Sequence, residues 1–239
     1  MRQSARAAGV APATMTRLAQ ALGLGGFDAM RRPAMAAFAR SVGEQGSEPM
    51  SNAGDALEPF REQPALARAQ AGNLASVAVH NPAPSLAAAA QRILQARSVL
   101  FLGLRASFGT AYHLHYTCDW LRPGTALATD PGGAWADRLA ALEPTDLLVA
   151  VSQAPYTVHT VEAVQQTAAR GVPVLALTDS ALSPLARAAT QSLLFDAASP
   201  AFFHSMTGAQ ALAETLMQAV AKQGGEAVVQ RLAQRQKQL

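Results

Sequence analysis

Polar side chains cluster in three short stretches, each next to the end of an apolar run. Ser107, Ser152 and Asp179 each stand within a few residues of such an end. Hydroxyl, guanidinium and carboxylate groups at the start of a helix, where free N–H groups favour anions, can bind a small polar ligand. The same residue types also serve as plain helix caps, which is the alternative interpretation. The residues that we expect to contact a ligand are Gly103, Arg105, Ser107, Ser152, Tyr156, Thr157, Thr160, Asp179 and Ser183.

The elements between these stretches must bring them together. Short apolar runs alternate with longer segments of helical spacing, notably 107–121, 157–170 and 206–221. Runs that are apolar on both faces and alternate with helices predict an α/β fold with a parallel five-stranded sheet flanked by helices. Right-handed crossovers then place the polar stretches along one edge of the sheet. The five runs are 98–103, 125–129, 146–152, 173–178 and 192–196.

Composition excludes several classes of protein. Half of the 239 residues are apolar and 15% are charged, which excludes a chain disordered over its whole length. No run reaches the roughly 18 apolar residues of a membrane helix, and the N-terminus lacks the apolar core of a secretory signal. We therefore expect a cytoplasmic protein without membrane contact. The single cysteine, Cys118, excludes an internal disulfide, and we expect it to be a buried structural thiol.

Positive charge is concentrated near the N-terminus. Residues 1–40 hold six of the 19 basic residues and one of the 16 acidic residues, a local net charge of +5, whereas the remainder carries −2. A basic head on a mildly acidic body favours contact with a polyanion. An arginine-rich face that merely contacts solvent is the alternative.

The basic head has the pattern of a helix-turn-helix over residues 3–22. Gly9 can adopt the positive φ that lets the chain leave a first helix, and Val10, Met15 and Leu18 supply apolar positions for packing a second one. The second helix would expose polar groups to base edges in a major groove, with nearby arginines on phosphates. An ordinary helical hairpin is the alternative. The expected DNA contacts are Thr14, Thr16, Arg17, Gln20, Arg6 and Arg31.

Four phrases carry a resemblance to a known family: AAGVAPATMTRLAQALGLGGFDAMRR, LGLRAS, VAVSQAPYTVHTVEAV and LTDSALSPLA. The chain resembles the RpiR family of bacterial transcriptional regulators, in which a helix-turn-helix domain precedes a sugar isomerase (SIS) domain that senses a phosphorylated sugar or a related metabolite. The resemblance implies a SIS-like, flavodoxin-like sheet domain, a small all-α N-terminal domain, operator DNA as partner, and a homodimer or tetramer. The implied parts are a helix-turn-helix at 1–45, a linker and helical connection at 46–83, a SIS effector-binding domain at 84–223 and a C-terminal helix at 224–239.

Two features depart from the family pattern. The usual SIS phosphate loop reads S-x-S-G-x-T, but residues 152–157 read SQAPYT, so a hydroxyl is lost and Pro155 has no N–H to offer. An S-x-x-P-Y variant resembles one within the regulator family. The helix that family members carry ahead of the helix-turn-helix is also missing, and we expect that the start of the chain is assigned too late.

The rival interpretation is an enzyme, a sugar-phosphate isomerase-like catalyst with a helical N-terminal extension. It would need a general base, for which His159 and Glu162 are candidates. A sensor that has lost DNA binding is a third possibility. We expect a regulator without catalytic residues or a cofactor, because the basic head and the altered phosphate loop argue against an enzyme. We also expect no metal, since His113 and His115 would lie on different faces of a helix and could not share one. Tyr112, Tyr116 and Trp120 have the spacing of a packed helix face.

Overall fold

The computed structural model describes residues 11, 13–14, 16–17, 63–129 and 135–237, and the chain divides into two compact units, Met1–Glu58 and Pro59–Leu239. In the first unit, residues 13–14 and 16–17 are helical, with Thr14 and Arg17 exposed. The rest of the predicted helix-turn-helix, with Arg6, Gln20 and Arg31, lies outside the described residues.

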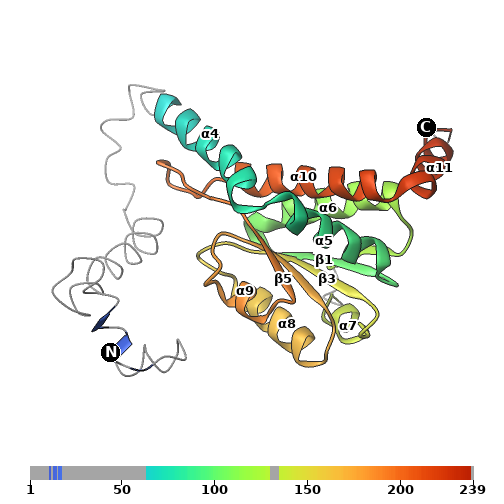
Figure 1. The fold of residues 1–239 in the computed structure, drawn as a ribbon, viewed down its shortest axis with the longest axis horizontal. Coiled ribbons are helices and arrows are strands. Elements are labelled where there is room, and N and C mark those ends of the chain that lie inside the picture. Colours follow the sequence, from blue (N-terminus) through green and yellow to red (C-terminus); the bar gives the residue numbers. More distant parts are fainter. Residues whose placement is uncertain (1–10, 12, 15, 18–62, 130–134, 238–239) are drawn as a thin grey trace. The chain divides into compact units, whose positions relative to one another are not determined.

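A five-stranded parallel sheet forms the centre of the second unit (Figure 1). Its strands are β1 (Val99–Gly103), β2 (Thr125–Leu127), β3 (Leu147–Val151), β4 (Val174–Thr178) and β5 (Gln191–Leu194). The spatial order is β2-β1-β3-β4-β5, and every neighbouring pair is parallel. The predicted fold class of this unit is therefore confirmed. All residues of β1, β3 and β4 are buried, which explains why these runs are apolar without alternation.

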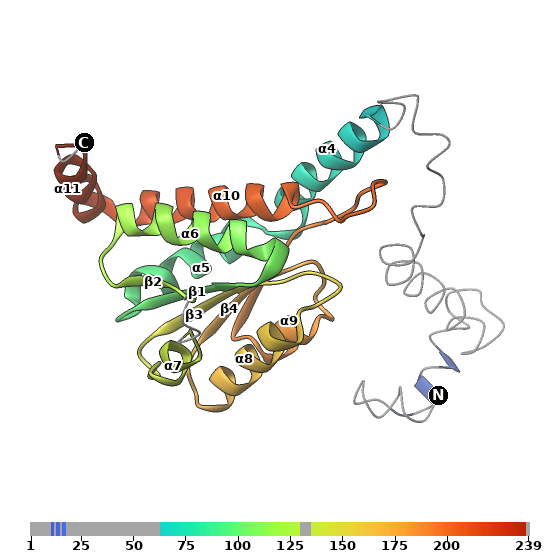
Figure 2. The ribbon, with the colours of Figure 1, turned by 180° about the vertical axis from the view of Figure 1, so that it is seen from behind.

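Helices cover both faces of the sheet (Figures 1 and 2). On one face lie α5 (Ala83–Gln95), α6 (Phe108–Leu121) and α10 (Thr207–Gln223), with α4 (Gln63–His80) packed on α10. On the other face lie α7 (Trp135–Ala140), α8 (Val158–Ala169) and α9 (Pro184–Ala188). The 3-10 turn η1 (Arg105–Ser107) precedes α6, and α11 (Gly225–Gln236) follows α10. No helix among the described residues is long and apolar enough to cross a bilayer.

The two faces have separate hydrophobic cores because side chains alternate along each strand. Phe101 points into the core beneath α5, α6 and α10, where it joins Leu114 and Leu212. Leu102 points the other way, toward the core that contains Val164 of α8 and Leu185 of α9. Pro184 occupies the first turn of α9, and the Ser183 hydroxyl caps that helix.

The path of the chain reverses direction between β1 and β3. From β1 the chain adds β2 on one side, and it then returns to place β3 on the other side of β1. At such a reversal the loops after the two central strands diverge and leave a crevice at the carboxyl edge, which is where ligands bind in open α/β sheets. The turn 104–107, after β1, and the loop 152–157, after β3, both lie at this edge.

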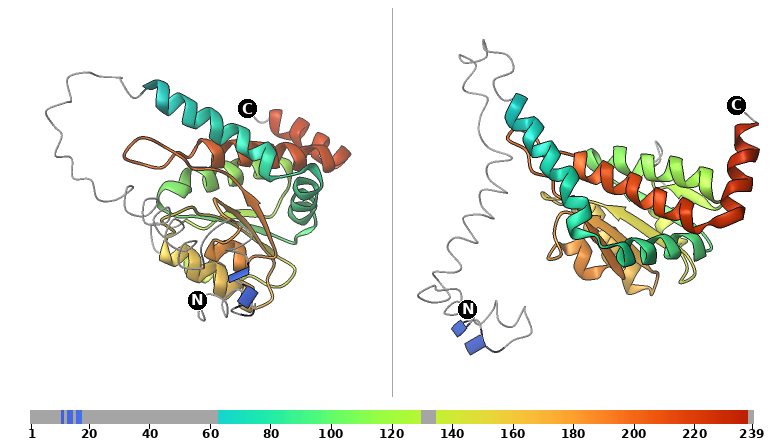
Figure 3. Two further views of the ribbon diagram at one scale, coloured as in Figure 1. Left: turned by 60° about the vertical axis from the view of Figure 1, so that its left-hand side comes forward. Right: turned by 45° about the horizontal axis from the view of Figure 1, so that its top comes forward.

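Helix α4 is attached to the segment that follows β5 (Figure 3). The buried Asn73 side chain donates to the Ala198 carbonyl at 2.8 Å and accepts from the Ala198 N–H at 3.1 Å. Asn81, just after α4, makes the same pair of bonds with Leu194, at 2.7 and 2.8 Å. These paired amide contacts fix α4 and the residue after it to the end of β5 and to the segment that follows.

Four aromatic rings form a continuous row along α6. The centroids of Phe108, Tyr112, Tyr116 and Trp120 follow one another at 6.4, 6.2 and 6.3 Å. The expectation that the two tyrosines lie on a packed helix face is wrong, since Tyr112 is 51% and Tyr116 is 52% exposed. Their i, i+4 spacing stacks the rings on each other and leaves their outer faces open.

Candidate ligand-binding site

The turn after β1 is unusually tight and carries Ser107 inward. A Cβ atom on Gly103 would lie 2.5 Å from the Ser107 carbonyl oxygen and 2.8 Å from Ala111 Cβ, so only glycine fits. Arg105 has a φ of 54°, which lies in the left-handed region that residues other than glycine rarely adopt. Ser107 is 3% exposed, whereas the Arg105 side chain extends into solvent.

A chain of hydrogen bonds links this turn to two other segments. The Ser107 hydroxyl donates to Oε1 of Gln153 at 3.0 Å, and Nε2 of Gln153 lies 2.7 Å from Nε2 of His204. With its oxygen accepting from Ser107, the Gln153 amide donates to an unprotonated His204 nitrogen. Burial lowers the pKa of His204, although the charge of Asp179 opposes the shift. His204 is therefore a neutral hydrogen-bond acceptor in this network.

Asp179, immediately after β4, organises the loop at 152–157. Its carboxylate accepts from the Ala154 N–H at 3.1 Å, from the Tyr156 hydroxyl at 2.8 Å and from the Thr178 hydroxyl at 3.3 Å. Burial and the neighbouring Asp179 charge raise the pKa of Tyr156, so its phenol stays protonated and donates. The ends of β3 and β4 are thereby joined.

The remaining predicted residues occupy different positions around these loops. Ser152 is buried, and Thr157 begins α8 without a side-chain cap. Thr160 is fully buried, and its hydroxyl has no hydrogen-bond partner among the described residues. Ser183 accepts from the Ala186 N–H at 3.0 Å and so acts as a helix cap. Ligand contact by any of the nine residues stays a prediction.

Two members of the network, Gln153 and His204, are absent from the sequence-derived set. Gln153 directly follows Ser152 just after β3. Its position beside a predicted site residue could have identified it from the sequence. His204 lies 51 residues from its partner, in a segment without a motif, so no local pattern could pair the two.

The structure removes several other candidates. The His159 and Glu162 side chains are 71% and 56% exposed and lie 3.4 Å apart in solvent.

Cys118 is fully buried as predicted, and burial raises the pKa of its thiol to about 12, which makes it unreactive. No group of three metal-ligating side chains occurs in the part of the chain that the structure describes.

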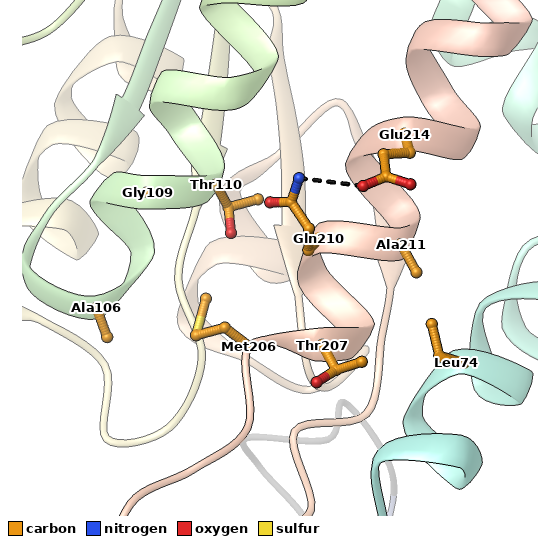
Figure 4. Close-up of a pocket in the computed structure, with 9 residues that line it drawn as sticks. All are labelled: Leu74, Ala106, Gly109, Thr110, Met206, Thr207, Gln210, Ala211 and Glu214. Carbon is orange, nitrogen blue, oxygen red and sulfur yellow. Dashed lines mark hydrogen bonds between the residues drawn. The ribbon is translucent and has the colours of Figure 1, made fainter.

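A pocket of about 480 Å³ lies between α4, α6 and α10 (Figure 4). Gln210 and Glu214, which share a 3.3 Å hydrogen bond, form its polar side, and Leu74 of α4 faces Ala211 across it. None of the nine predicted residues lines it. The lining residues are Leu74, Ala106, Gly109, Thr110, Met206, Thr207, Gln210, Ala211 and Glu214.

A parallel sheet covered by helices on both faces, with polar loops at its reversal point, defines an open α/β domain of the class in which ligands bind at this edge. The family model that matches the sequence is that of the SIS domain, over residues 92–222, and the chain belongs to this family. The resemblance stated from the sequence is thus confirmed for the domain itself.

Solved structures agree with this assignment. The sugar isomerase domain of an RpiR transcription factor from Sphaerobacter thermophilus is 29% identical, covering 74% of this chain and 99% of that chain with a TM-score of 0.69. The Vibrio vulnificus NanR protein, complexed with ManNAc-6P, is 21% identical, covering 98% of this chain and 82% of that chain with a TM-score of 0.66. The second likeness shows a shared fold.

One curated relative is an enzyme. The glutamine–fructose-6-phosphate aminotransferase (isomerizing) of Pyrobaculum aerophilum is 31% identical over 120 residues, which make up 49% of this chain. The match spans 19% of that enzyme's length.

Proposed function

We propose that the chain is a DNA-binding transcriptional regulator whose SIS domain binds a phosphosugar or a related small metabolite. The observation that carries this proposal is the polar network at the reversal point of the sheet, in which the buried Ser107 and Gln153 side chains connect to the partly exposed His204. The likeness to the sugar isomerase domain of an RpiR transcription factor supports the regulatory part.

The basic head is the proposed DNA-binding element. Its net charge of +5 would be attracted to the phosphate backbone. Thr14 and Arg17 are exposed on residues of helical conformation, which supports the assignment of this segment as a recognition helix. The proposed partner is double-stranded operator DNA, contacted through the residues named from the sequence.

A homodimer, or a tetramer built from it, is the proposed assembly. Two heads in a dimer would match two half-sites about one helical turn apart. The exposed aromatic row of α6 supports self-association, because a monomer rarely leaves several stacked rings in water.

The proposed regulation depends on the segment between β5 and α10. His204 of this segment contacts Gln153, and Ala198 of the same segment is bonded to Asn73 of α4. A metabolite that rearranges the network would change how this segment holds α4. The response is limited by the difference in the metabolite's affinity for the two states.

A sugar-phosphate isomerase-like enzyme is the second candidate function. The neutral His204 imidazole favours it, because such a group can act as a general base. A turnover assay with hexose and pentose phosphates distinguishes the two functions. Conversion of an aldose phosphate to a ketose phosphate that is lost in a His204→Leu variant would favour the enzyme.

Fluorescence anisotropy tests the DNA-binding part. The 239-residue chain is titrated onto DNA from upstream of its own gene, and onto scrambled DNA, across a salt series. We expect specific binding that weakens steeply with salt, and Arg17→Ala to weaken it and lower the salt slope by about one. Arg187→Ala, an exposed arginine of α9, is the matched control for the charge change. Equal affinity for both DNAs, or no binding at low salt, would contradict the proposal.

A further inference from the structure

The loop that precedes α8 already binds an anionic group, the carboxylate of Asp179. The Asp179 carboxylate accepts from the Ala154 N–H at 3.1 Å and from the Tyr156 hydroxyl at 2.8 Å. We propose that Asp179 occupies the anion position of the 152–157 loop, so that the loop binds hydroxyl groups of an uncharged sugar or polyol rather than a phosphate ester. This inference rests on the proposed function in that it assumes a metabolite at this edge of the sheet.

The backbone at Ala154 and Pro155 has no N–H group free for a phosphate. A loop that leads into a helix holds an anion through successive N–H groups and the helix dipole. The Ala154 N–H is used by Asp179, and Pro155, the next residue, has no N–H. Two consecutive positions of the loop are therefore closed to a phosphate oxygen.

The negative charge of Asp179 also disfavours a phosphate ester at this loop. No described lysine, arginine or histidine forms an ion pair with Asp179, so no salt bridge among these residues neutralises its carboxylate. A phosphate ester at the loop would place up to two negative charges beside a third. Arg105, on the turn after β1, is exposed and would attract an anion to the outer edge of the site. Arg105 does not free the Ala154 N–H from Asp179.

The groups that remain are those that bind sugar hydroxyls. Asp179 is half-buried, and a carboxylate can accept about four hydrogen bonds, so the three it receives leave capacity for a ligand hydroxyl. The Phe203 ring lies 4.1 Å from that of His204, centroid to centroid, and its side chain is 49% exposed. A flat apolar ring beside polar groups suits the C–H face of a sugar.

The test is a titration of the 239-residue chain with inorganic phosphate, followed through the backbone amide resonances of residues 152–160 in ¹⁵N-labelled protein. Sodium chloride at matched ionic strength is the blank. We expect no phosphate-dependent shift of the Ala154 amide in the wild type. Asp179→Asn keeps the size of the side chain, removes the charge that repels phosphate, and leaves a neutral oxygen that competes less well for the Ala154 N–H. We expect this variant to gain a saturable Ala154 shift, with phosphate affinity higher by about tenfold or more.

Tyr156→Phe is the matched control, since it removes one hydrogen bond to Asp179 and leaves the carboxylate in place. It should reject phosphate as the wild type does. The proposal is overturned if phosphate shifts the Ala154 amide of the wild type, or if Asp179→Asn folds and gains no binding. Should Asp179→Asn fail to fold, the wild-type titration still decides, because saturable binding at Ala154 contradicts the proposal and its absence is the expected result.

A pair of ligands gives the second measurement. A hexose and its 6-phosphate are compared in the same spectra, and we expect the phosphate group to add nothing to shifts in residues 152–160. A 6-phosphate that binds there more tightly than its parent sugar overturns the inference. None of these readouts uses DNA, so a failure of operator binding in the anisotropy assay remains a separate result.

Discussion

The side-chain amide of Gln153 and the imidazole of His204 lie 2.7 Å apart, and this contact joins the loop after β3 to the segment that precedes α10. The same segment is held to α4 through both polar atoms of the Asn73 side chain. The carboxyl edge of the sheet is thus connected to α4 by these hydrogen bonds and by the stretch of backbone between Ala198 and His204.

His204→Leu should uncouple the two ends of this connection. The variant cannot accept from Gln153, so a ligand that moves the loop no longer acts on α4. We expect unchanged operator affinity without effector and a coupling free energy reduced by about 1 kcal/mol or more. Anisotropy titrations with and without the metabolite that shifts wild-type binding measure this. Phe202→Ala, at an 88% exposed neighbour, is the control, and an equal loss in both variants would contradict the role of His204.

Ser107→Ala should abolish the effector response and spare DNA binding. Ser107 is 3% exposed, and its hydroxyl donates to Gln153, so removing the hydroxyl leaves the Gln153 oxygen unpaired at a cost of about 1 kcal/mol in stability. Isothermal titration with the effector gives the loss of affinity, and anisotropy gives operator binding. Ser85→Ala on α5, outside the network, should behave as wild type. A Ser107→Ala chain that responds normally would show that the site is assigned incorrectly.

The sheet and its polar edge were predictable because their signals are local. A strand buried on both faces must be a continuous apolar run, as in residues 147–151, and the residues after each strand are fixed to one edge by parallel topology. The pairing of Gln153 with His204 could not be predicted from the sequence, because it depends on how the segment 195–206 folds back. Exposure of Tyr112 was also not predictable, since i, i+4 aromatic spacing is the same for a buried face and an open one.

Gly103→Ala should destabilise the protein although it adds a single methyl group. The new Cβ would meet a backbone carbonyl at 2.5 Å, and a backbone cannot move aside as a flexible side chain can. We expect a loss of about 1–3 kcal/mol in the free energy of unfolding, measured by urea denaturation. Gly72→Ala in α4 is the matched control: no atom lies within 4 Å of the position that its methyl group would take, so it should stabilise the chain by about 0.5–1 kcal/mol. Similar effects at both glycines would mean that the turn after β1 is less tight than described.

Asp146 connects the starts of β1 and β3 at the opposite edge of the sheet. Its carboxylate accepts from Arg97 at 2.7 and 2.9 Å, from the Ser98 N–H and hydroxyl, and from the Glu143 N–H. Burial by itself would raise its pKa, but the donors, led by Arg97, outweigh burial and hold the pKa at about 2.

This lowered pKa predicts how stability depends on pH. Because the folded pKa lies below the ordinary value of 3.8, the contribution of Asp146 is complete above pH 3.8 and is lost as pH falls toward 2. It amounts to about 2 kcal/mol, which Asp146→Asn should lose at pH 7. Urea denaturation of both proteins from pH 7 to pH 3 should show their difference shrinking below pH 4, since protonation removes the same charge. Asp137→Asn, at an exposed carboxylate on α7, is the control and should match the wild type throughout. A difference between wild type and Asp146→Asn that stays constant with pH would assign the loss to packing instead of charge.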